Sequence, residues 1–235
     1  MNHFKVKNPR KDLSFEIAFT KAYRDAVKRY AHPAQIELAC LRAQYPAILH
    51  PIQEEDLLAG RVEAGLVGLG IQGQTGGYGY YIDEPRVTEA LEFGEGNAKY
   101  REDLHDLLIF WKTNSSNNKV LRNTPDSIKH ILFSDNWKQT PIPASPIIRM
   151  AGAYLDFDKL IRLGLPGMRA EVTAYRERAE QEGGDAVLYQ CMDGALELMG
   201  QVCLWYRAQA LELLEQAGDE KRKGELRRVA QALEA

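Results

Sequence analysis

The chain has 235 residues, 45% of them apolar and 27% charged, a balance typical of globular proteins rather than of disordered chains. Its 30 Lys and Arg against 33 Asp and Glu give a net charge of -3, which argues against a general nucleic-acid-binding protein. No stretch approaches the roughly 18 consecutive apolar residues of a membrane span. The start lacks the apolar run of a signal peptide. We therefore expect a cytoplasmic protein with neither a membrane nor a nucleic acid as partner.

Cysteine and histidine are too sparse and too scattered for a metal site. The three cysteines, Cys40, Cys191 and Cys203, form no CxxC pair, so neither a zinc site nor a disulfide framework is indicated. The five histidines show no ligand spacing such as HExxH. The sequence therefore predicts no metal site. Each cysteine sits among apolar residues of an expected helix, which favours packing in a core.

Helical spacing of apolar residues runs through much of the first half of the chain. It predicts helices over residues 13–30, 33–46, 85–94 and 98–112. Pro33 and Pro85 fit first helical turns, where the N–H that proline lacks has no partner within the helix. Pro46 is expected to end the second helix. The apolar face of the fourth is formed by Tyr100, Leu104, Leu107, Leu108 and Trp111.

Two segments between these helices predict irregular structure. Residues 65–82 are rich in glycine and indicate a loop, with a short strand at 78–82. The polar run 113–118 is typical of an exposed loop. Thr124 is a good cap for a further helix, with Pro125 at its first position.

The last third predicts helices separated by glycine and aspartate. We expect them over residues 156–164, 167–184, 185–217 and 219–235. Gly164 is expected to stop the first of them, and Asp185 and Asp219 to cap the last two. The final helix is still periodic at residue 235, which fits either a chain that continues in a larger protein or a simple terminal helix.

Three blocks of sequence resemble pyruvate formate-lyase-type glycyl radical enzymes. The segment YPAILHPIQEEDLLAGR, residues 45–61, is similar to an early acidic–leucine–glycine–arginine turn of that family. DFDKLIRLGLPGMRAEVTAYRERA, residues 156–179, is similar to its Asp-Tyr-x-Lys-x-Leu-x-x-Gly-Leu-x-Gly segment. Residues 195–235 resemble the long paired helices that follow. The order and spacing of the blocks agree, and the likeness is weakest between residues 65 and 146.

The resemblance implies a fold, a chemistry and a set of partners. The fold is mainly α, the helical amino-terminal region of a ten-stranded α/β barrel, with few short strands. The expected organisation is a basic arm at 1–12 and a partial domain at 13–235. The implied activity is that of a lyase or formate acetyltransferase in an anaerobic cell, acting on a small organic acid or related metabolite. The implied partners are the rest of the enzyme, a second copy and a radical-activating enzyme that uses S-adenosylmethionine and an iron–sulfur cluster.

The elements that carry this chemistry in the family are a radical glycine and a radical cysteine. The glycine lies in an Arg-Val-x-Gly-Tyr-like loop, and none of the three Arg-Val pairs here continues in that way. The three cysteines are expected to pack in the core. We therefore assign no catalytic residue and no cofactor to this chain. The glycyl radical belongs to the full-length enzyme.

Six residues are candidates for a substrate pocket. Dehydratases of the family carry a Gly-His pair where this chain has Ala151-Gly152, so a dehydratase activity is disfavoured. Arg149 either binds a substrate carboxylate or forms a surface ion pair. The candidates are Arg149, Gly152 and Tyr154, with Gln72, Gln74 and Thr75 in the glycine-rich segment.

Two functions remain open from the sequence. In the first, the chain is the amino-terminal segment of a glycyl radical enzyme and is inactive alone. In the second, it is a stand-alone helical protein derived from that family, with a binding or regulatory role and no catalysis.

Overall fold

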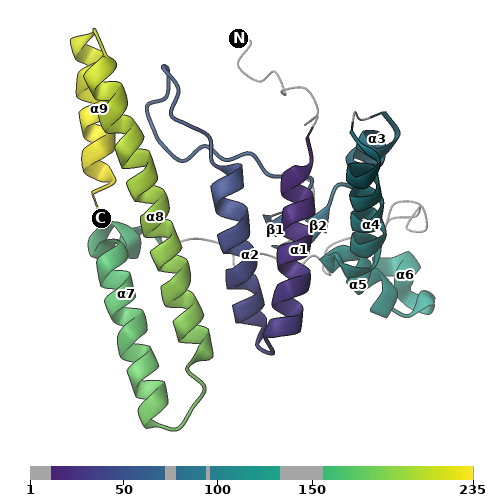
Figure 1. Ribbon diagram of the computed structural model, residues 1–235. Coiled ribbons are helices and arrows are strands. Elements are labelled where there is room, and N and C mark those ends of the chain that lie inside the picture. The colour runs from purple at the N-terminus through teal and green to yellow at the C-terminus, as the bar shows by residue number, and fades with distance from the viewer. Residues whose placement is uncertain (1–11, 72–77, 94–95, 133–155, 235) are drawn as a thin grey trace. The chain divides into compact units, whose positions relative to one another are not determined.

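The computed structural model describes residues 12–71, 78–93, 96–132 and 156–234, which are mainly helical, as predicted (Figure 1). They divide into two compact units. Unit 1 holds residues 12–25 and 64–132 of the described chain, and unit 2 holds 26–63 and 156–234. Each unit has its own internal packing.

Unit 1 is built on the contact between helices α1 (Ser14–Arg29) and α4 (Ala98–Asn114). Trp111 of α4 is fully buried, and its ring centroid lies 5.0 Å from that of Tyr23 and 6.1 Å from that of Phe19. Its indole Nε1 donates a hydrogen bond to Thr20 Oγ1 at 2.8 Å. Four of the five residues predicted for the apolar face of α4 are buried, while Tyr100 is half-buried and accepts a hydrogen bond from Leu13 N.

A two-stranded antiparallel hairpin packs in the same unit. Strand β1 (Val67–Ile71) pairs with β2 (Tyr78–Ile82) in a register that places Gly70 opposite Gly79. The predicted strand at 78–82 is confirmed. The irregular backbone expected for the start of the glycine-rich segment is wrong, because β1 forms there. Glycine has a low strand propensity, but the burial of Val67 and Leu69 stabilises the paired strands.

The remaining helices of unit 1 are α3 (Glu84–Phe93), α5 (Ser116–Asn123) and α6 (Asp126–Leu132). The exposed loop predicted at 113–118 is wrong, because α4 extends to Asn114 and α5 begins two residues later. Ser115 joins the two helices. It is buried, its backbone N–H bonds to Trp111 O, and its hydroxyl accepts from Asn118 N. A polar run can thus be a helix junction when one residue serves as cap for both helices.

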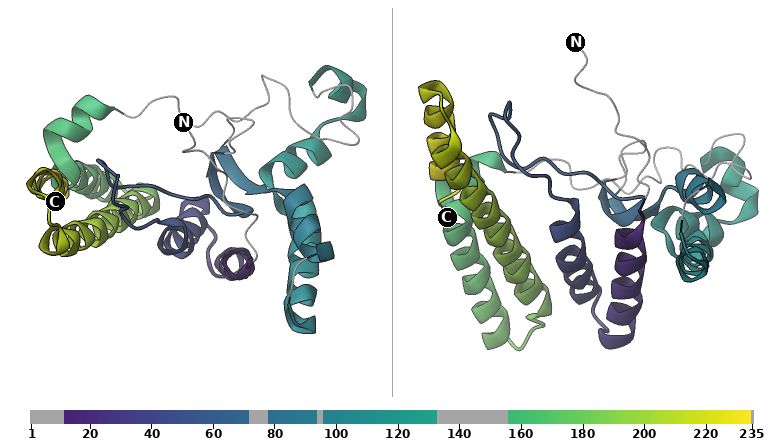
Figure 2. Two further views of the ribbon diagram at one scale, coloured as in Figure 1. Left: turned by 90° about the horizontal axis from the view of Figure 1, so that it is seen from above. Right: turned by 45° about the horizontal axis from the view of Figure 1, so that its top comes forward.

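Unit 2 is organised around the long helix α8 (Val187–Gln216), which packs against α2 (Pro33–Ile48), α7 (Phe157–Gln181) and α9 (Glu220–Ala232). Helices α7 and α8 run antiparallel, and α9 returns along the last turns of α8 (Figures 1 and 2). Arg169 of α7 holds Asp193 of α8 in a bidentate pair at 2.7 and 3.0 Å, which sets the pKa of this carboxyl below its usual range.

The helix ends in unit 2 follow the sequence with two corrections. Asp219 caps α9 as predicted, and Gly164, with φ 60° and ψ -178°, interrupts the helical backbone of α7 at the predicted stop. Pro46 does not end α2, which runs on to Ile48. Asp185 is not the cap of α8. The cap position is Ala186, although the Asp185 carboxylate accepts a hydrogen bond from Val187 N at 2.8 Å.

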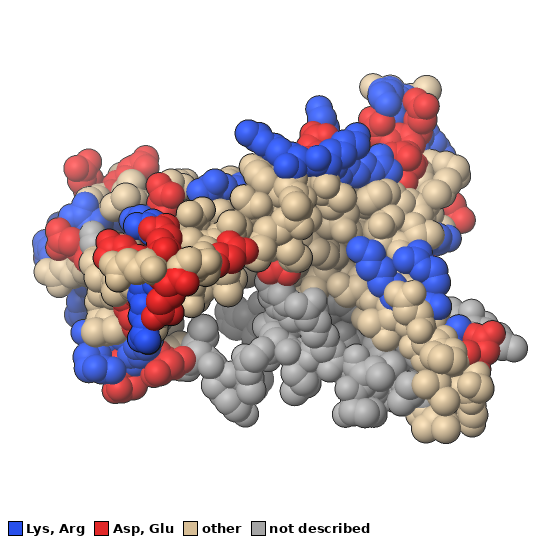
Figure 3. Space-filling model, turned by 90° about the horizontal axis from the view of Figure 1, so that it is seen from below, with Lys and Arg blue, Asp and Glu red and all other residues tan. Residues whose placement is uncertain are grey.

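Charged residues of both signs are interspersed over the part of the surface where α7, α8 and α9 lie (Figure 3). Several form pairs along α7, including Arg176–Glu180 and Arg178–Glu182. This face shows no extended basic surface for a polyanion. Within the described ranges, every helix is too short or too polar to span a bilayer.

Candidate functional site

All six substrate-pocket candidates of the sequence analysis lie outside the described residues. They are Gln72, Gln74, Thr75, Arg149, Gly152 and Tyr154. They therefore stay predictions. The structure does describe the elements next to the first three of them, and it describes the segment that carries the earliest block of family resemblance.

The hairpin that flanks residues 72–77 is anchored by two side chains from helices. Glu16 of α1 is fully buried, and its Oε1 accepts a hydrogen bond from Leu66 N at 2.8 Å, just before β1. Ser116 of α5 accepts from Tyr80 N at 3.0 Å in β2. The backbones of Ile71 and Tyr78, on either side of the loop, are paired with each other. The base of the glycine-rich segment is thus fixed within unit 1 by polar contacts.

Residues 49–63 form a closed loop in unit 2, which we call the 49–63 loop. A bridge between Leu49 and Val62 closes its base, where His50 Nε2 lies 2.8 Å from Glu63 Oε2. Ile52 is buried with Tyr206 and Ala210 of α8. These contacts seat the base of the loop in the core of unit 2.

Two side chains of α8 bind the backbone of this loop. The Tyr206 hydroxyl donates to Arg61 O at 2.9 Å, and Gln209 Oε1 accepts from Ile52 N at 3.1 Å. Burial raises the pKa of the Tyr206 hydroxyl, so it keeps the proton that it donates.

Arg222 of α9 fixes the outer part of the loop. Its guanidinium donates to Asp56 O at 2.8 Å and to Gln53 O at 2.9 Å, and it also pairs with Glu225 at 3.2 Å. Within the loop, Asp56 forms an ion pair with Arg61. Sequence reasoning did not single out Arg222, because it lies in the charged run EKRKGELRR, where all the basic residues look alike.

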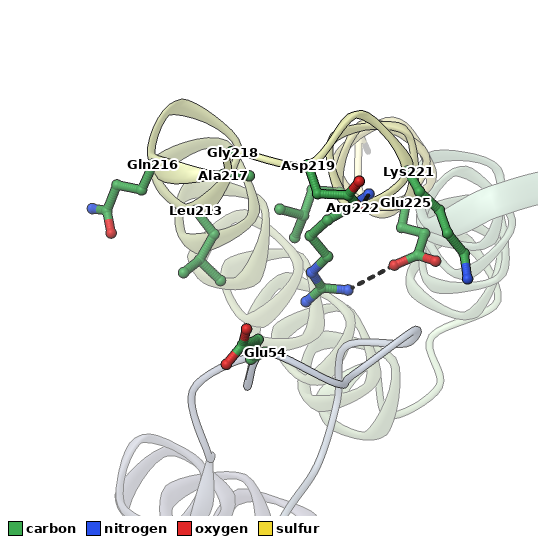
Figure 4. Close-up of a pocket in the computed structure, with 10 residues that line it drawn as sticks. Glu54, Leu213, Gln216, Ala217, Gly218, Asp219, Lys221, Arg222 and Glu225 are labelled. Atoms are coloured by element: carbon green, nitrogen blue, oxygen red, sulfur yellow. Dashed lines mark hydrogen bonds and ion pairs between the residues drawn. The ribbon is translucent and has the colours of Figure 1, made fainter.

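A hollow of about 570 Å³ lies between the loop and the turn that joins α8 to α9 (Figure 4). Leu213, Ala217 and Leu226 form its apolar part. Its polar lining is Glu54, Gln216, Asp219, Lys221, Arg222 and Glu225.

Replacing Arg222 with alanine should loosen the 49–63 loop. The variant loses hydrogen bonds from a charged donor, each worth about 1.5–3 kcal/mol, and leaves two backbone carbonyls without that donor. Amide hydrogen exchange in residues 50–63 should speed up by about ten- to a hundredfold. The control is Lys221→Ala, which removes an exposed neighbour. Equal exchange in the two variants would show that Arg222 does not hold the loop.

The cysteines lack the setting of an activated nucleophile. Cys40 and Cys191 are buried, and Cys203 is half-buried. Desolvation raises the pKa of the Cys191 and Cys203 thiols, so less thiolate is present at neutral pH than in the unfolded chain. Core packing, as predicted, is confirmed for Cys40 and Cys191. In the described ranges no three acidic, histidine or cysteine side chains gather as metal ligands.

Alkylation kinetics should report this protection. Iodoacetamide at pH 7 is expected to modify Cys191 and Cys203 more slowly in the folded chain than in urea, because the thiolate is the nucleophile and burial raises the pKa of both thiols. The rate of alkylation should rise with pH in both states. In the folded chain this rise should occur at higher pH than in urea, because the folded thiols have the higher pKa. A site that reacts fast in the folded chain at pH 7 would reveal an activated thiolate.

Comparison with known proteins gives one family. A family model described as pyruvate formate lyase-like matches residues 19–235, nearly the whole chain. The chain belongs to the pyruvate formate lyase-like family. The match includes the 49–63 loop and helices α2 to α9, so the elements described above are those of the family region. No curated protein matches the chain.

Proposed function

We propose that this chain is the helical amino-terminal part of a glycyl radical enzyme and that it does not catalyse a reaction alone. The observation that carries the proposal is the family match over residues 19–235 in a sequence without an Arg-Val-x-Gly-Tyr-like radical loop. The protected cysteines of α8 support it, because a radical cysteine must meet substrate.

The proposal includes the wider setting of such an enzyme. The substrate is a small organic acid or related metabolite, and the reaction is that of a lyase or formate acetyltransferase in the cytoplasm of an anaerobic cell. The radical is installed on the full-length enzyme by an activating enzyme with S-adenosylmethionine and an iron–sulfur cluster. The partners are the remainder of the enzyme and a second copy. Residues 13–235 form the partial domain and residues 1–12 a basic arm.

Electron paramagnetic resonance tests the proposal. The isolated chain is incubated anaerobically with the activating enzyme of the same organism, S-adenosylmethionine and a reductant. We expect no glycyl radical signal from this chain, and a signal from the enzyme that contains the radical loop, as the positive control. A radical signal on the isolated chain would overturn its assignment as catalytically incomplete.

A further inference from the structure

The outer part of the 49–63 loop presents apolar side chains to solvent on a fixed backbone. Leu57 and Leu58 are 63% and 83% exposed. They directly follow Asp56, whose carbonyl accepts from Arg222 and whose carboxylate pairs with Arg61. Exposed leucines on a preorganised loop are typical of a docking surface, because little conformational entropy is left to lose on binding.

The hollow next to this loop is concave and is lined by Glu54 of the loop, whereas Leu57 and Leu58 lie outside its lining. Arg222, which holds the loop, also lines the hollow together with Glu54, and its apolar part is formed by Leu213 and Ala217 (Figure 4). A partner that fits here brings one apolar side chain for the hollow and further apolar contact for Leu57 and Leu58. We call the hollow and these two leucines the loop surface.

The charges around the loop surface determine which sign of charge on a partner is favoured. Arg222 and Glu225 pair with each other and cancel. Among the other charged residues that line the hollow, Glu54 and Asp219 are acidic and Lys221 is basic, and the exposed Glu55 follows Glu54 in the loop. In the described part of the chain, none of these three carboxylates has a cation within ion-pair distance. The loop surface therefore carries an excess of negative charge and favours a basic segment.

Residues 1–12 of this chain have the complementary chemistry. The segment MNHFKVKNPRKD alternates Phe4 and Val6 with Lys5 and Lys7, and it carries four basic residues against one acidic residue. We propose that the loop surface of one copy receives the basic arm, residues 1–12, of a second copy. The inference deepens the homodimer of the proposed function by naming the two surfaces that meet.

Zero-length cross-linking of a mixture of unlabelled and ¹⁵N-labelled full-length chains tests the contact. A carbodiimide should join Lys5 or Lys7 to Glu54 or Glu55, with half of the linked peptides carrying one labelled and one unlabelled partner. Links found only between peptides of the same label would place the arm on its own copy and overturn the proposal. The absence of these links would also overturn it.

Charge reversal provides a second, independent readout. Glu54→Lys with Glu55→Lys should weaken dimerisation, measured by analytical ultracentrifugation, by about tenfold or more, and adding Lys5→Glu with Lys7→Glu should restore most of it. The control, Glu89→Lys with Glu92→Lys, makes the same net change on exposed residues of α3 and should leave dimerisation unchanged. An equal effect of both reversals, or no effect of either, contradicts the proposal. Neither result touches the radical assay, so the proposed function would stand.

Discussion

Replacing Trp111 with alanine is expected to lower the free energy of unfolding by about 3–5 kcal/mol, the usual cost of removing a large buried aromatic side chain. Trp111 is fully buried, contacts Phe19 and Tyr23, and donates to Thr20. The variant leaves a cavity between α1 and α4 and removes a donor from a buried hydroxyl. Urea denaturation followed by circular dichroism measures the loss.

Ile109→Ala is the matched control in the same helix. Ile109 is 55% exposed, so its truncation should change the free energy of unfolding by no more than about 0.5 kcal/mol. Hydrogen exchange should place the loss from Trp111→Ala in α1 and α4. A variant at Trp111 that costs no more than the control would show that these helices are not packed on the tryptophan.

Alanine at Gly79 should destabilise the hairpin more than alanine at Gly70, although the two glycines face each other across the strands. Both have a φ near 150°, so each substitution carries strain of about 1–3 kcal/mol. A Cβ at Gly79 would also lie 2.3 Å from Ser116 Oγ, whereas a Cβ at Gly70 would meet nothing within 4 Å. Overpacking should add about 1–3 kcal/mol at Gly79.

The pair of variants separates strain from crowding, because the strain is shared and the crowding is not. Urea denaturation gives both free energies of unfolding. Equal losses would mean that Ser116 does not sit over Gly79. A larger loss at Gly70 would contradict the open space found beside it.

The sequence predicts an element well where one local pattern decides it. The apolar face of α4 repeats at helical spacing, and four of its five predicted residues are buried. Asp219 caps α9 through a bond to Arg222 N, three residues away. Such patterns are complete within a few residues, so no distant partner is needed to recognise them.

Features that depend on distant partners were not predictable from the sequence. Glu16 and Thr20 are polar residues on a helix, and their burial follows from Leu66 and Trp111, which lie far along the chain. Strand β1 is rich in glycine and forms because β2 pairs with it.

The candidate site shows the same division. The family block at 45–61 could be recognised from its own residues, and it forms the 49–63 loop with its exposed leucines. The residues that fix this loop, Tyr206 and Arg222, come from α8 and α9. No local signal distinguishes them from neighbouring aromatic and basic residues. The substrate-pocket candidates lie outside the described residues and stay predictions.

Intact mass spectrometry of the polypeptide, purified anaerobically from its native cells, tests most directly whether this chain is part of a larger radical enzyme. A mass far above 26.6 kDa, in a polypeptide that also contains a radical glycine loop, is the expected result. A polypeptide of 26.6 kDa that purifies without any chain bearing such a loop would contradict the account. It would favour a helical binding or regulatory protein derived from the same family.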